Sequence, residues 1–368
     1  MLFVLDKSLA DNLESPDVRE ALFYIAIGRR EGKHLIFSED FKTMKAFAGH
    51  EGLTSDTREI YQNVFNRLST LKSFSETVVR RVRVVAENRD ISWKDMGEGK
   101  KEIIVSASLI RDSSFVQPTI LLCEDKSDCE LYEIMAKTNI RGKIIIRYDS
   151  RGGGGSQTCP TYVDIQNKRN CFCLCFADSD QKYPHGPLGT TAQPLMKITT
   201  TNLLSEFKII DVREIENLIP TAMFDKVSDP NRIRCISFLE KLECSPIADA
   251  RRFVDLKNGL KGREYFGLLA HNADSAAYWQ KFFNTINSWI NISESCLNNQ
   301  ACDKSKSENC ACIIMYGLGE HILEAVIEML NKQSPQKISE MTAALKPYWQ
   351  EYGELISAWC CGSNRIST

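Results

Sequence analysis

The 368-residue sequence has no excess of charge of either sign and no long apolar run. Its 46 Lys and Arg residues against 48 Asp and Glu residues exclude a uniformly basic coat for nucleic acid, although local basic patches remain compatible with these numbers. No apolar run approaches the length that crosses a bilayer, and the opening MLFVLDKSLADNLESPDVRE turns acidic too early for a signal or transit peptide. We therefore expect a cytoplasmic protein that does not contact a membrane.

Several catalytic signatures are missing as well. The sequence contains no GxxxxGK[ST] phosphate loop, no Ser-His-Asp elbow and no papain-like cysteine motif. Cysteine is abundant, with 14 residues, but CFCLC at 171–175 lies in an apolar run, where thiols act as small hydrophobic groups. Since a chain of this length needs no disulfides to fold, we expect reduced thiols.

Length and apolar patterning predict three ranges. Residues 1–115 alternate short apolar runs with helical spacing, which predicts a small α/β domain. Residues 116–290 contain continuous apolar runs separated by helical stretches, which predicts a parallel sheet flanked by helices. Residues 291–368 are expected to form a helical C-terminal region that caps the core or forms a homo-oligomer.

The central range has a distinct order of expected elements. PTILLC, KIIIRY, CFCLCFA and EFKIIDV are the expected strands, and KSDCELYEIMAKT and TYVDIQNKR are the expected helices. SRGGGGSQT lies between the second strand and the second helix, where we expect a tight loop whose backbone approaches phosphate groups.

Acidic residues follow three of these strands, and one more begins the first helix: Glu124, Asp128, Asp178, Asp180, Glu214 and Glu216. A DxD motif alone is usually a solvated turn, so the prediction depends on the whole set. In an open parallel sheet the functional crevice lies outside the carboxyl ends of the strands, and we expect these acids to converge there. Such a cluster would repel itself unless cations bound, and Mg²⁺ or Mn²⁺ prefers oxygen ligands.

In order, ILLCEDKSD, GGGG, FADSD and REIENLIP resemble the TOPRIM fold, and most closely the nucleases of the OLD (overcoming lysogenization defect) type and their stand-alone relatives in bacterial anti-phage defence. The likeness covers roughly residues 117–265. It implies Mg²⁺-dependent hydrolysis of phosphodiester bonds in DNA or RNA. It also implies roles: Glu124 as metal ligand or general base, Asp128 as a further ligand, Asp178 and Asp180 as principal ligands, and Glu214 and Glu216 for a second metal or for orienting water.

A basic residue commonly completes such a centre by countering charge in the transition state. KNGLKGREYF offers Lys257, Lys261 and Arg263, and we favour Lys261, although a lysine in a polar stretch is usually a solvated surface group. His185 and His271 are the nearest histidines in the sequence, and we expect structural roles for both.

Two other functions stay open. The ATPase half of OLD proteins is absent from this sequence, and an ATP-binding partner chain is one way to restore it. In the first alternative the acids are vestigial, and this chain is a non-catalytic scaffold or sensor subunit bound to an ATPase. Alternatively, Asp6, Glu39 and Asp40 follow the first two apolar runs and would serve as the acids of a PIN-like RNase. Because acids follow strands in many α/β proteins, an ordinary scaffold domain is expected there.

A polar segment near residue 300 is rich in cysteine. Cys296, Cys302, Cys310 and Cys312 have the spacing C-x5-C-x7-C-x-C, and four thiolates can close a tetrahedral structural Zn²⁺ site. Paired CxxC motifs are missing, so scattered thiols are the alternative. Cys360 and Cys361 are candidates to replace one ligand.

Overall fold

The computed structural model describes residues 1–87, 90–140, 144–199, 203–224, 229–290, 292–299, 302 and 312–366. It is a mixed α/β structure with parallel sheets flanked by helices, as expected. The chain forms two compact units: the first comprises Met1–Phe176, Lys197–Lys208 and Pro347–Thr368, and the second Ala177–Met196 and Ile209–Lys346. The boundaries of these units differ from those of the three sequence ranges. Two strands, Cys173–Ala177 and Ser205–Ile209, begin in the first unit and end in the second.

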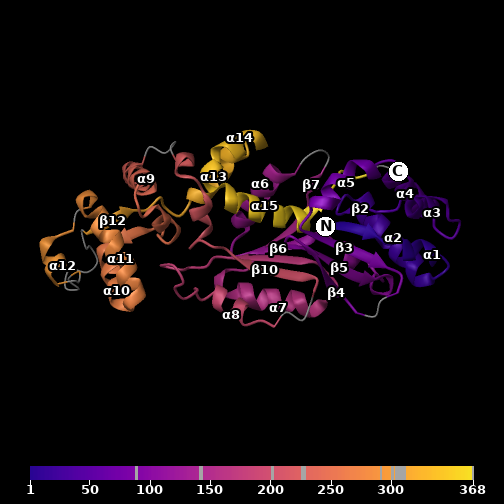
Figure 1. Cartoon of the computed structure of the whole chain (residues 1–368), viewed down its shortest axis with the longest axis horizontal. Helices are drawn as coiled ribbons and strands as arrows, with labels where there is room; N and C mark the ends of the chain where they lie inside the picture. Colours follow the sequence, from indigo (N-terminus) through magenta and orange to yellow (C-terminus); the bar gives the residue numbers. More distant parts are fainter. Residues whose placement is uncertain are drawn as a thin grey trace. The chain divides into compact units, whose positions relative to one another are not determined.

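The first sheet of the first unit has the order β2-β1-β3-β5-β4. Its strands are β1 (Leu2–Leu5), β2 (Leu35–Phe37), β3 (Arg80–Val85), β4 (Ser92–Gly97) and β5 (Lys100–Ser106). All neighbours run parallel except β4, which is antiparallel to β5. Its helices are α1 (Lys7–Asp11), α2 (Pro16–Arg30), α3 (Phe41–Gly49), α4 (Ser55–Phe65) and α5 (Leu68–Thr77), all labelled in Figure 1.

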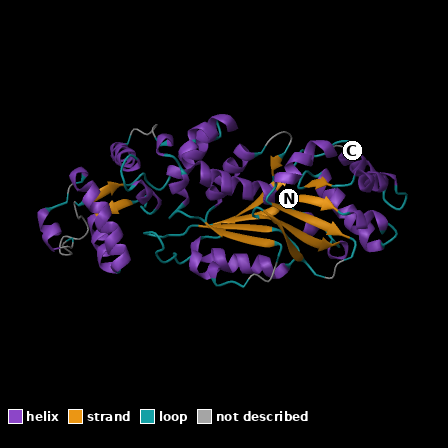
Figure 2. Ribbon diagram, viewed as in Figure 1, coloured by secondary structure: helices purple, strands orange, loops and turns teal. Residues whose placement is uncertain are grey.

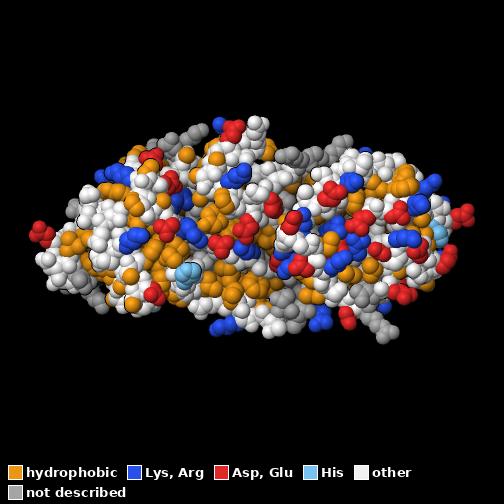
Figure 3. Space-filling view, in the orientation of Figure 1, with side chains coloured by type: hydrophobic (Ala, Val, Ile, Leu, Met, Phe, Trp, Pro, Cys, Tyr) orange, Lys and Arg blue, Asp and Glu red, His pale blue; other side chains and the backbone are white. Residues whose placement is uncertain are grey.

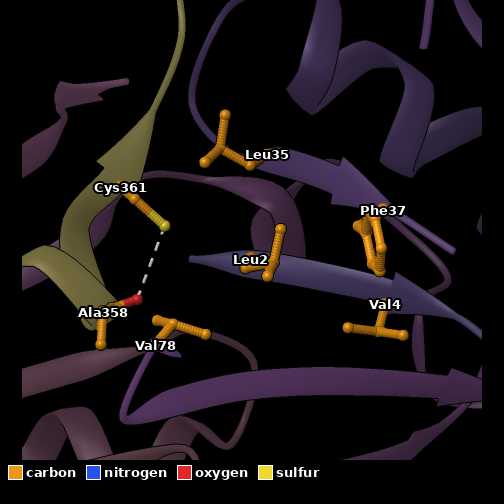
Figure 4. Packing of buried hydrophobic residues seen from close by; sticks show 7 residues of the cluster. All are labelled: Leu2, Val4, Leu35, Phe37, Val78, Ala358 and Cys361. Carbon is orange, nitrogen blue, oxygen red and sulfur yellow. Dashed lines mark hydrogen bonds between the residues drawn. The ribbon is translucent and has the colours of Figure 1, made fainter. Parts of the chain in front are cut away.

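Part of the core of this unit is built from both ends of the chain. Figure 4 shows apolar side chains from β1, β2 and the C-terminal segment packed together: Leu2, Val4, Leu35, Phe37, Val78, Ala358 and Cys361. The amino group of Met1 donates to the carbonyl of Cys361 at 2.8 Å. Cys360 and Cys361 are therefore buried in the core of the first unit, where they act as small hydrophobic residues.

The second sheet of the first unit has the order β10-β9-β6-β8. Figure 2 draws the strands of the protein in orange. Its strands are β6 (Thr119–Cys123), β8 (Tyr148–Gly152), β9 (Cys173–Ala177) and β10 (Ser205–Ile209), and β6 is parallel to both β8 and β9. In Figure 1, α6 (Lys126–Asn139) and α15 (Lys346–Cys360) lie on one side of this sheet and α7 (Thr158–Lys168) on the other. Tyr132 of α6 stacks on Phe176 with ring centroids 4.2 Å apart, and Tyr162 of α7 meets Phe207 at 5.9 Å.

The expected strand KIIIRY is divided in the structure. Its apolar part becomes β7 (Ile145–Ile146), which pairs antiparallel with β13 (Cys361–Gly362) at the end of the chain. The strand next to β6 begins only at Tyr148 and extends into the expected glycine loop as far as Gly152. Since β8 is an edge strand, it needs little apolar sequence, which is why its polar residues predicted a loop.

The second unit is mainly helical. Its helices are α8 (Ala192–Met196), α9 (Pro230–Glu243), α10 (Gly262–His271), α11 (Ala273–Ile286), α12 (Glu294–Asn299), α13 (Ile322–Leu330) and α14 (Pro335–Met341). A two-stranded antiparallel ribbon joins β11 (Gly259–Lys261) to β12 (Ile313–Tyr316). Tyr265 of α10 stacks on Phe283 of α11 at 5.2 Å, so the aromatic residues of AAYWQKFF serve core packing.

The surface carries charges of both signs. On the face shown in Figure 3, Lys and Arg side chains are interspersed with Asp and Glu, in keeping with the near-neutral composition. Across the ranges that the structure describes, no helix is both long enough and apolar enough to cross a membrane.

Candidate acidic centre and thiol cluster

The turn after β9 is tied to the segment after β10. The hydroxyl of Ser179 donates to the carbonyl of Val212 at 2.5 Å, and the amide of Asp180 donates to the carbonyl of Arg213 at 2.9 Å. Ser179, the middle residue of the DSD motif, is 1% exposed, so its buried side chain stabilises the turn. The turn that carries Asp178 therefore runs beside the segment that leads to Glu214.

Asp180 occupies an unusual backbone position. Its φ of +53° lies in the left-handed region, which Asp tolerates better than most residues. Its side chain also lies directly against Gly189, where an added Cβ would meet Asp180 Oδ2 at 2.0 Å. The amide of Gly189 donates to the carbonyl of Ser179 at 2.9 Å, so the loop after the motif closes over it. Residue 189 must be glycine for this close approach.

Glu214 and Glu216 stand at the start of a short 3₁₀ helix, Ile215–Leu218, and both are buried. The amide of Glu214 donates to Asn217 Oδ1 at 2.9 Å, and Asn217 Nδ2 donates in turn to the carbonyls of Arg251 and Val254 at 2.7 and 3.0 Å. This buried amide side chain thus joins the segment of the two glutamates to the segment that continues to Lys257.

Two cations partly compensate these acids. Lys257 Nζ lies 3.2 Å from Glu216 Oε1. Arg213 lies between two acids, with Nη2 at 3.1 Å from Asp255 Oδ2 and Nε at 3.4 Å from Glu214 Oε1. Within the described part of the chain, the other oxygens, Glu214 Oε2 and Glu216 Oε2, are buried and have no hydrogen-bond partner. A buried carboxylate oxygen without a partner is costly, and it is the kind of atom that a divalent cation binds.

The pKa values of the centre reflect this crowding. Burial, and after it the charge of Asp255, raises the pKa of Glu214 to about 7. For Lys257, burial opposes the charge, but Glu216 first, then Glu214 and Asp178, raise the pKa of its ammonium above the ordinary value. Asp178, Glu214 and Glu216 therefore act on the same ammonium group. We call Asp178, Glu214, Glu216, Asp255, Arg213 and Lys257 the acidic centre.

The structure separates the candidate basic residues. Lys257 pairs with Glu216, whereas Lys261 is exposed at the start of α10, where its backbone amide donates to Glu264 Oε2 at 3.2 Å. Two members of the centre, Arg213 and Asp255, were not predicted from the sequence. The signal for Asp255 was an acid two residues before a lysine in the otherwise apolar stretch FVDLK.

Glu124 and Asp128 belong to the first unit. Asp128 Oδ2 accepts from the amide of Asp125 at 2.8 Å and closes a capping box at the start of α6, so this acid has a structural role. Glu124 follows β6 directly. β6 and β9 are parallel neighbours with Leu122 opposite Cys175, and their carboxyl ends therefore lie at the same edge of the sheet, as expected.

The glycine loop is used to hold the end of β6. The amides of Gly153 and Gly154 donate to the carbonyls of Cys123 and Glu124 at 2.7 and 3.0 Å. These two amides were expected to approach phosphates, but they are engaged within the protein. Gly154 has a φ of +70°, and a Cβ at Gly153 would lie 2.2 Å from Thr158 Oγ1, so both positions require glycine.

The acids of the N-terminal sheet are bound by arginines. Arg83 contacts Asp6 at 3.2 Å and Glu39 at 2.9 Å. Glu102 is fully buried between Arg81 at 2.7 Å and Arg83 at 2.8 Å. Asp6 also caps α1 by accepting from the amide of Ser8 at 2.9 Å, and Asp40 caps α3 in the same way. Asp6, Glu39 and Glu102 thus pair with arginines, and Asp6 and Asp40 cap helices.

Three thiols come together in the second unit. The side chains of Cys296, Cys302 and Cys312 are buried, and their sulfur atoms lie within 4.8 Å of one another. Cys310, the fourth predicted ligand, lies outside the described residues. Of the described residues, these thiols are the only group of three or more candidate metal ligands with such spacing, so the carboxylates of the acidic centre are spread more widely.

A groove of about 640 Å³ adjoins the acidic centre within the second unit. Its charged lining residues are Asp180, Lys182, Arg213, Glu264 and His271. The rings of Tyr183 and His271 meet edge to face in its wall with centroids 6.4 Å apart. His271, for which a structural role was expected, therefore lines the groove.

No family model matches this sequence, and neither a curated protein nor a solved structure is similar enough to count as a match. The likeness to TOPRIM nucleases therefore rests on the order of the sequence motifs alone.

Proposed function

We propose that this protein is a metal-dependent nuclease with a TOPRIM-like core, which hydrolyses phosphodiester bonds of DNA or RNA at the acidic centre. The observation that carries the proposal is the pair of buried oxygens, Glu214 Oε2 and Glu216 Oε2, which lack a hydrogen-bond partner among the described residues. Two cations do not balance the four carboxylates of the centre, so a divalent cation would relieve their repulsion. Carboxylate oxygens are the ligands that Mg²⁺ and Mn²⁺ prefer.

The residues of the acidic centre would have different roles in the reaction. Asp178, Glu214 and Glu216 would hold Mg²⁺ or Mn²⁺, which when bound activates water and offsets charge on the phosphoryl oxygens. Lys257 stays protonated because the acids raise its pKa, and its side chain is partly exposed, so it can donate to a phosphoryl oxygen. Arg213 lines the groove and is held by Asp255, so it would supply a second cation to a phosphate group bound in the groove.

Three further acids keep the roles that the resemblance implies. Glu124 would act as general base or ligand, Asp128 as a further ligand and Asp180 as a principal ligand. Asp180 also lines the groove. The structural capping role of Asp128 makes it the weakest of the three candidates.

The thiol cluster suits a different ion. Thiolates are soft ligands that select Zn²⁺ over Mg²⁺, and structural Zn²⁺ sites use buried cysteines in tetrahedral geometry. A structural Zn²⁺ at Cys296, Cys302 and Cys312 is therefore the second cofactor of the proposal.

The cellular setting is proposed from the resemblance alone. It comprises anti-phage defence in the cytoplasm, an ATPase partner protein and assembly into a homo-oligomer. The runner-up function, a scaffold or sensor subunit without catalysis, would keep these partners but would not cut nucleic acid.

A cleavage assay tests the proposal. The purified full-length chain is incubated with plasmid, single-stranded DNA and RNA, with Mg²⁺, with Mn²⁺ or with EDTA. Cleavage is expected with either metal and is expected to fall at least 100-fold in Asp178→Asn and Glu216→Gln. Asp274→Asn, at an exposed acid in the first turn of α11, serves as the matched control and should cut like wild type. Cleavage that survives both variants, or no cleavage under any condition, would overturn the proposal.

A further inference from the structure

One antiparallel ribbon links the thiol cluster to Lys257. Cys312 directly precedes β12, and its carbonyl accepts from the amide of Gly262 at 2.8 Å. Beyond the other end of β12, the amides of Leu318 and Gly319 donate to the carbonyls of Leu256 and Lys257 at 2.8 and 2.9 Å. The continuation of β12 therefore holds the backbone of Lys257, while its start belongs to the thiol cluster.

The thiol end of the ribbon is closely packed. A Cβ at Gly262 would lie 2.8 Å from Cys312 Cβ and 3.0 Å from Cys302 Sγ, so the ribbon backbone touches two of the three cysteines. The third, Cys296, comes from α12, a helix of six residues. Cys312 Sγ also accepts from the amide of Ser293 at 3.4 Å. Backbone donors of this kind orient thiolate ligands and stabilise their charge.

The end of the ribbon next to Lys257 is also closely packed. A Cβ at Gly317 would lie 2.2 Å from the carbonyl oxygen of Lys257, and one at Gly259 would lie 2.3 Å from that of Met315. Both glycines let the two strands approach at the bend where Lys257 leaves the ribbon. A shift of β12 along its length would therefore move the backbone of Lys257, whose ammonium pairs with Glu216.

We propose that a Zn²⁺ ion bound by Cys296, Cys302 and Cys312 fixes β12, and that β12 in turn holds Lys257 in place against Glu216. The thiol site would then position a residue of the acidic centre, in addition to stabilising the fold around the cysteines. The binding free energy of a structural Zn²⁺ contributes directly to folding, and here it would help to order the four-residue strand β12 and the six-residue helix α12. The inference rests on the proposed function only where cleavage is the readout.

Metal content and amide exchange test the inference in the full-length protein, independently of any activity. Wild type should hold close to one Zn²⁺ per chain, and Cys302→Ser should lose it. In Cys302→Ser, or in wild type treated with a chelator, the amides of Leu318 and Gly319 should exchange at least ten times faster. Amides in the middle of α11 report whether the whole unit has opened and should not change. Equal exchange at Leu318 and Gly319 with and without metal, or no Zn²⁺ bound by wild type, would refute the inference.

Two further variants distinguish the positioning of Lys257 by Zn²⁺ from a general destabilisation of the second unit. Cys302→His retains a Zn²⁺ ligand and should restore the slow exchange at Leu318 and Gly319. Cys244→Ser, at an exposed cysteine of the same unit, is the matched control and should behave as wild type. If cleavage is observed, loss of Zn²⁺ should lower kcat, because Lys257 is displaced from Glu216. A drop in kcat with unchanged exchange at Gly319 would contradict the positioning role.

Discussion

The ammonium of Lys257 lies 3.2 Å from Glu216 Oε1, while Glu216 Oε2 is buried with no hydrogen-bond partner in the described ranges. Oε1 of Glu216 is therefore paired with the ammonium of Lys257, whereas Oε2 is available to a ligand. The glutamate is 2% exposed, so this oxygen lies in the interior of the second unit. The pair makes Lys257 both a stabilising residue and a candidate catalytic one, and these two roles can be measured separately.

Lys257→Met should destabilise the protein. Removal of one partner leaves the buried charge of Glu216 uncompensated, and since Lys257 itself is partly exposed we expect a loss of about 2 kcal/mol in the free energy of unfolding. Denaturant unfolding measures the loss. The double variant Lys257→Met with Glu216→Gln should regain most of it, because the charge is then gone. A single variant as stable as wild type would mean that the pair contributes nothing.

Cleavage should depend on Lys257 and not on Lys261. Lys257→Gln removes the cation beside the acids, and we expect a loss of about 100-fold in kcat, as for other groups that stabilise transition-state charge. Lys261→Gln changes an exposed side chain at the start of α10 and should leave kcat close to wild type. The opposite ranking in the nuclease assay would restore Lys261 as the catalytic lysine.

Glu214 should make stability depend on pH in the metal-free protein. Its pKa is raised from 4.5 to about 7, so the folded state holds the proton more tightly than the unfolded state. Stability is therefore expected to fall as pH rises from about 4.5 to about 7 and to level off above that. The shift corresponds to roughly 3 kcal/mol. Glu214→Gln cannot ionise, and it should be more stable than wild type at about pH 8 and equal to it near pH 4.

Thermal unfolding at several pH values, with EDTA, measures this difference between Glu214→Gln and wild type. Added Mg²⁺ should reduce it at about pH 8, because a cation bound at the centre would favour the ionised carboxylate. A difference in melting temperature that does not vary with pH would show that Glu214 keeps an ordinary pKa.

Glu124→Gln should abolish cleavage without loss of stability. The side chain follows β6 at the edge of the sheet where β9 also ends, and the main chain there is held by Gly154. We expect at least a 100-fold drop in activity and an unchanged melting temperature. Glu130→Gln, at an exposed glutamate of the neighbouring helix α6, is the control. Full activity in Glu124→Gln would exclude this residue from the centre.

The N-terminal acids should prove structural. Asp6→Asn is expected to leave cleavage of DNA and RNA unchanged, because Asp6 is bound by Arg83 and caps α1. Arg83→Met should cost about 3 kcal/mol in the free energy of unfolding, since it removes one of the two cations that hold the fully buried Glu102. Loss of RNA cleavage in Asp6→Asn, with the fold intact by circular dichroism, would favour the PIN-like alternative.

Local sequence determined much of the first unit and the general place of the candidate site. The apolar runs at Thr119–Cys123 and Cys173–Ala177 form strands, and the two stretches of helical spacing between them form α6 and α7. These elements follow from side-chain periodicity, which depends on neighbours a few residues apart. The acids at Asp178 and Glu214 are visible in the sequence in the same way, because each follows an expected strand, Asp178 directly and Glu214 after one arginine.

Only the tertiary structure chose among residues with similar sequence surroundings. Lys257 and Lys261 stand four residues apart in the sequence, and what distinguishes them is that the ammonium of Lys257 contacts the buried Glu216 whereas Lys261 is exposed. The division of KIIIRY depends on pairing with β13, more than two hundred residues later. Three cysteines meet although they lie up to 16 residues apart in the chain: Cys296 in α12, Cys302, and Cys312 directly before β12. Long-range pairing of this kind leaves no periodic signal in the sequence. The residues that meet at the candidate site could therefore be identified only from the tertiary structure.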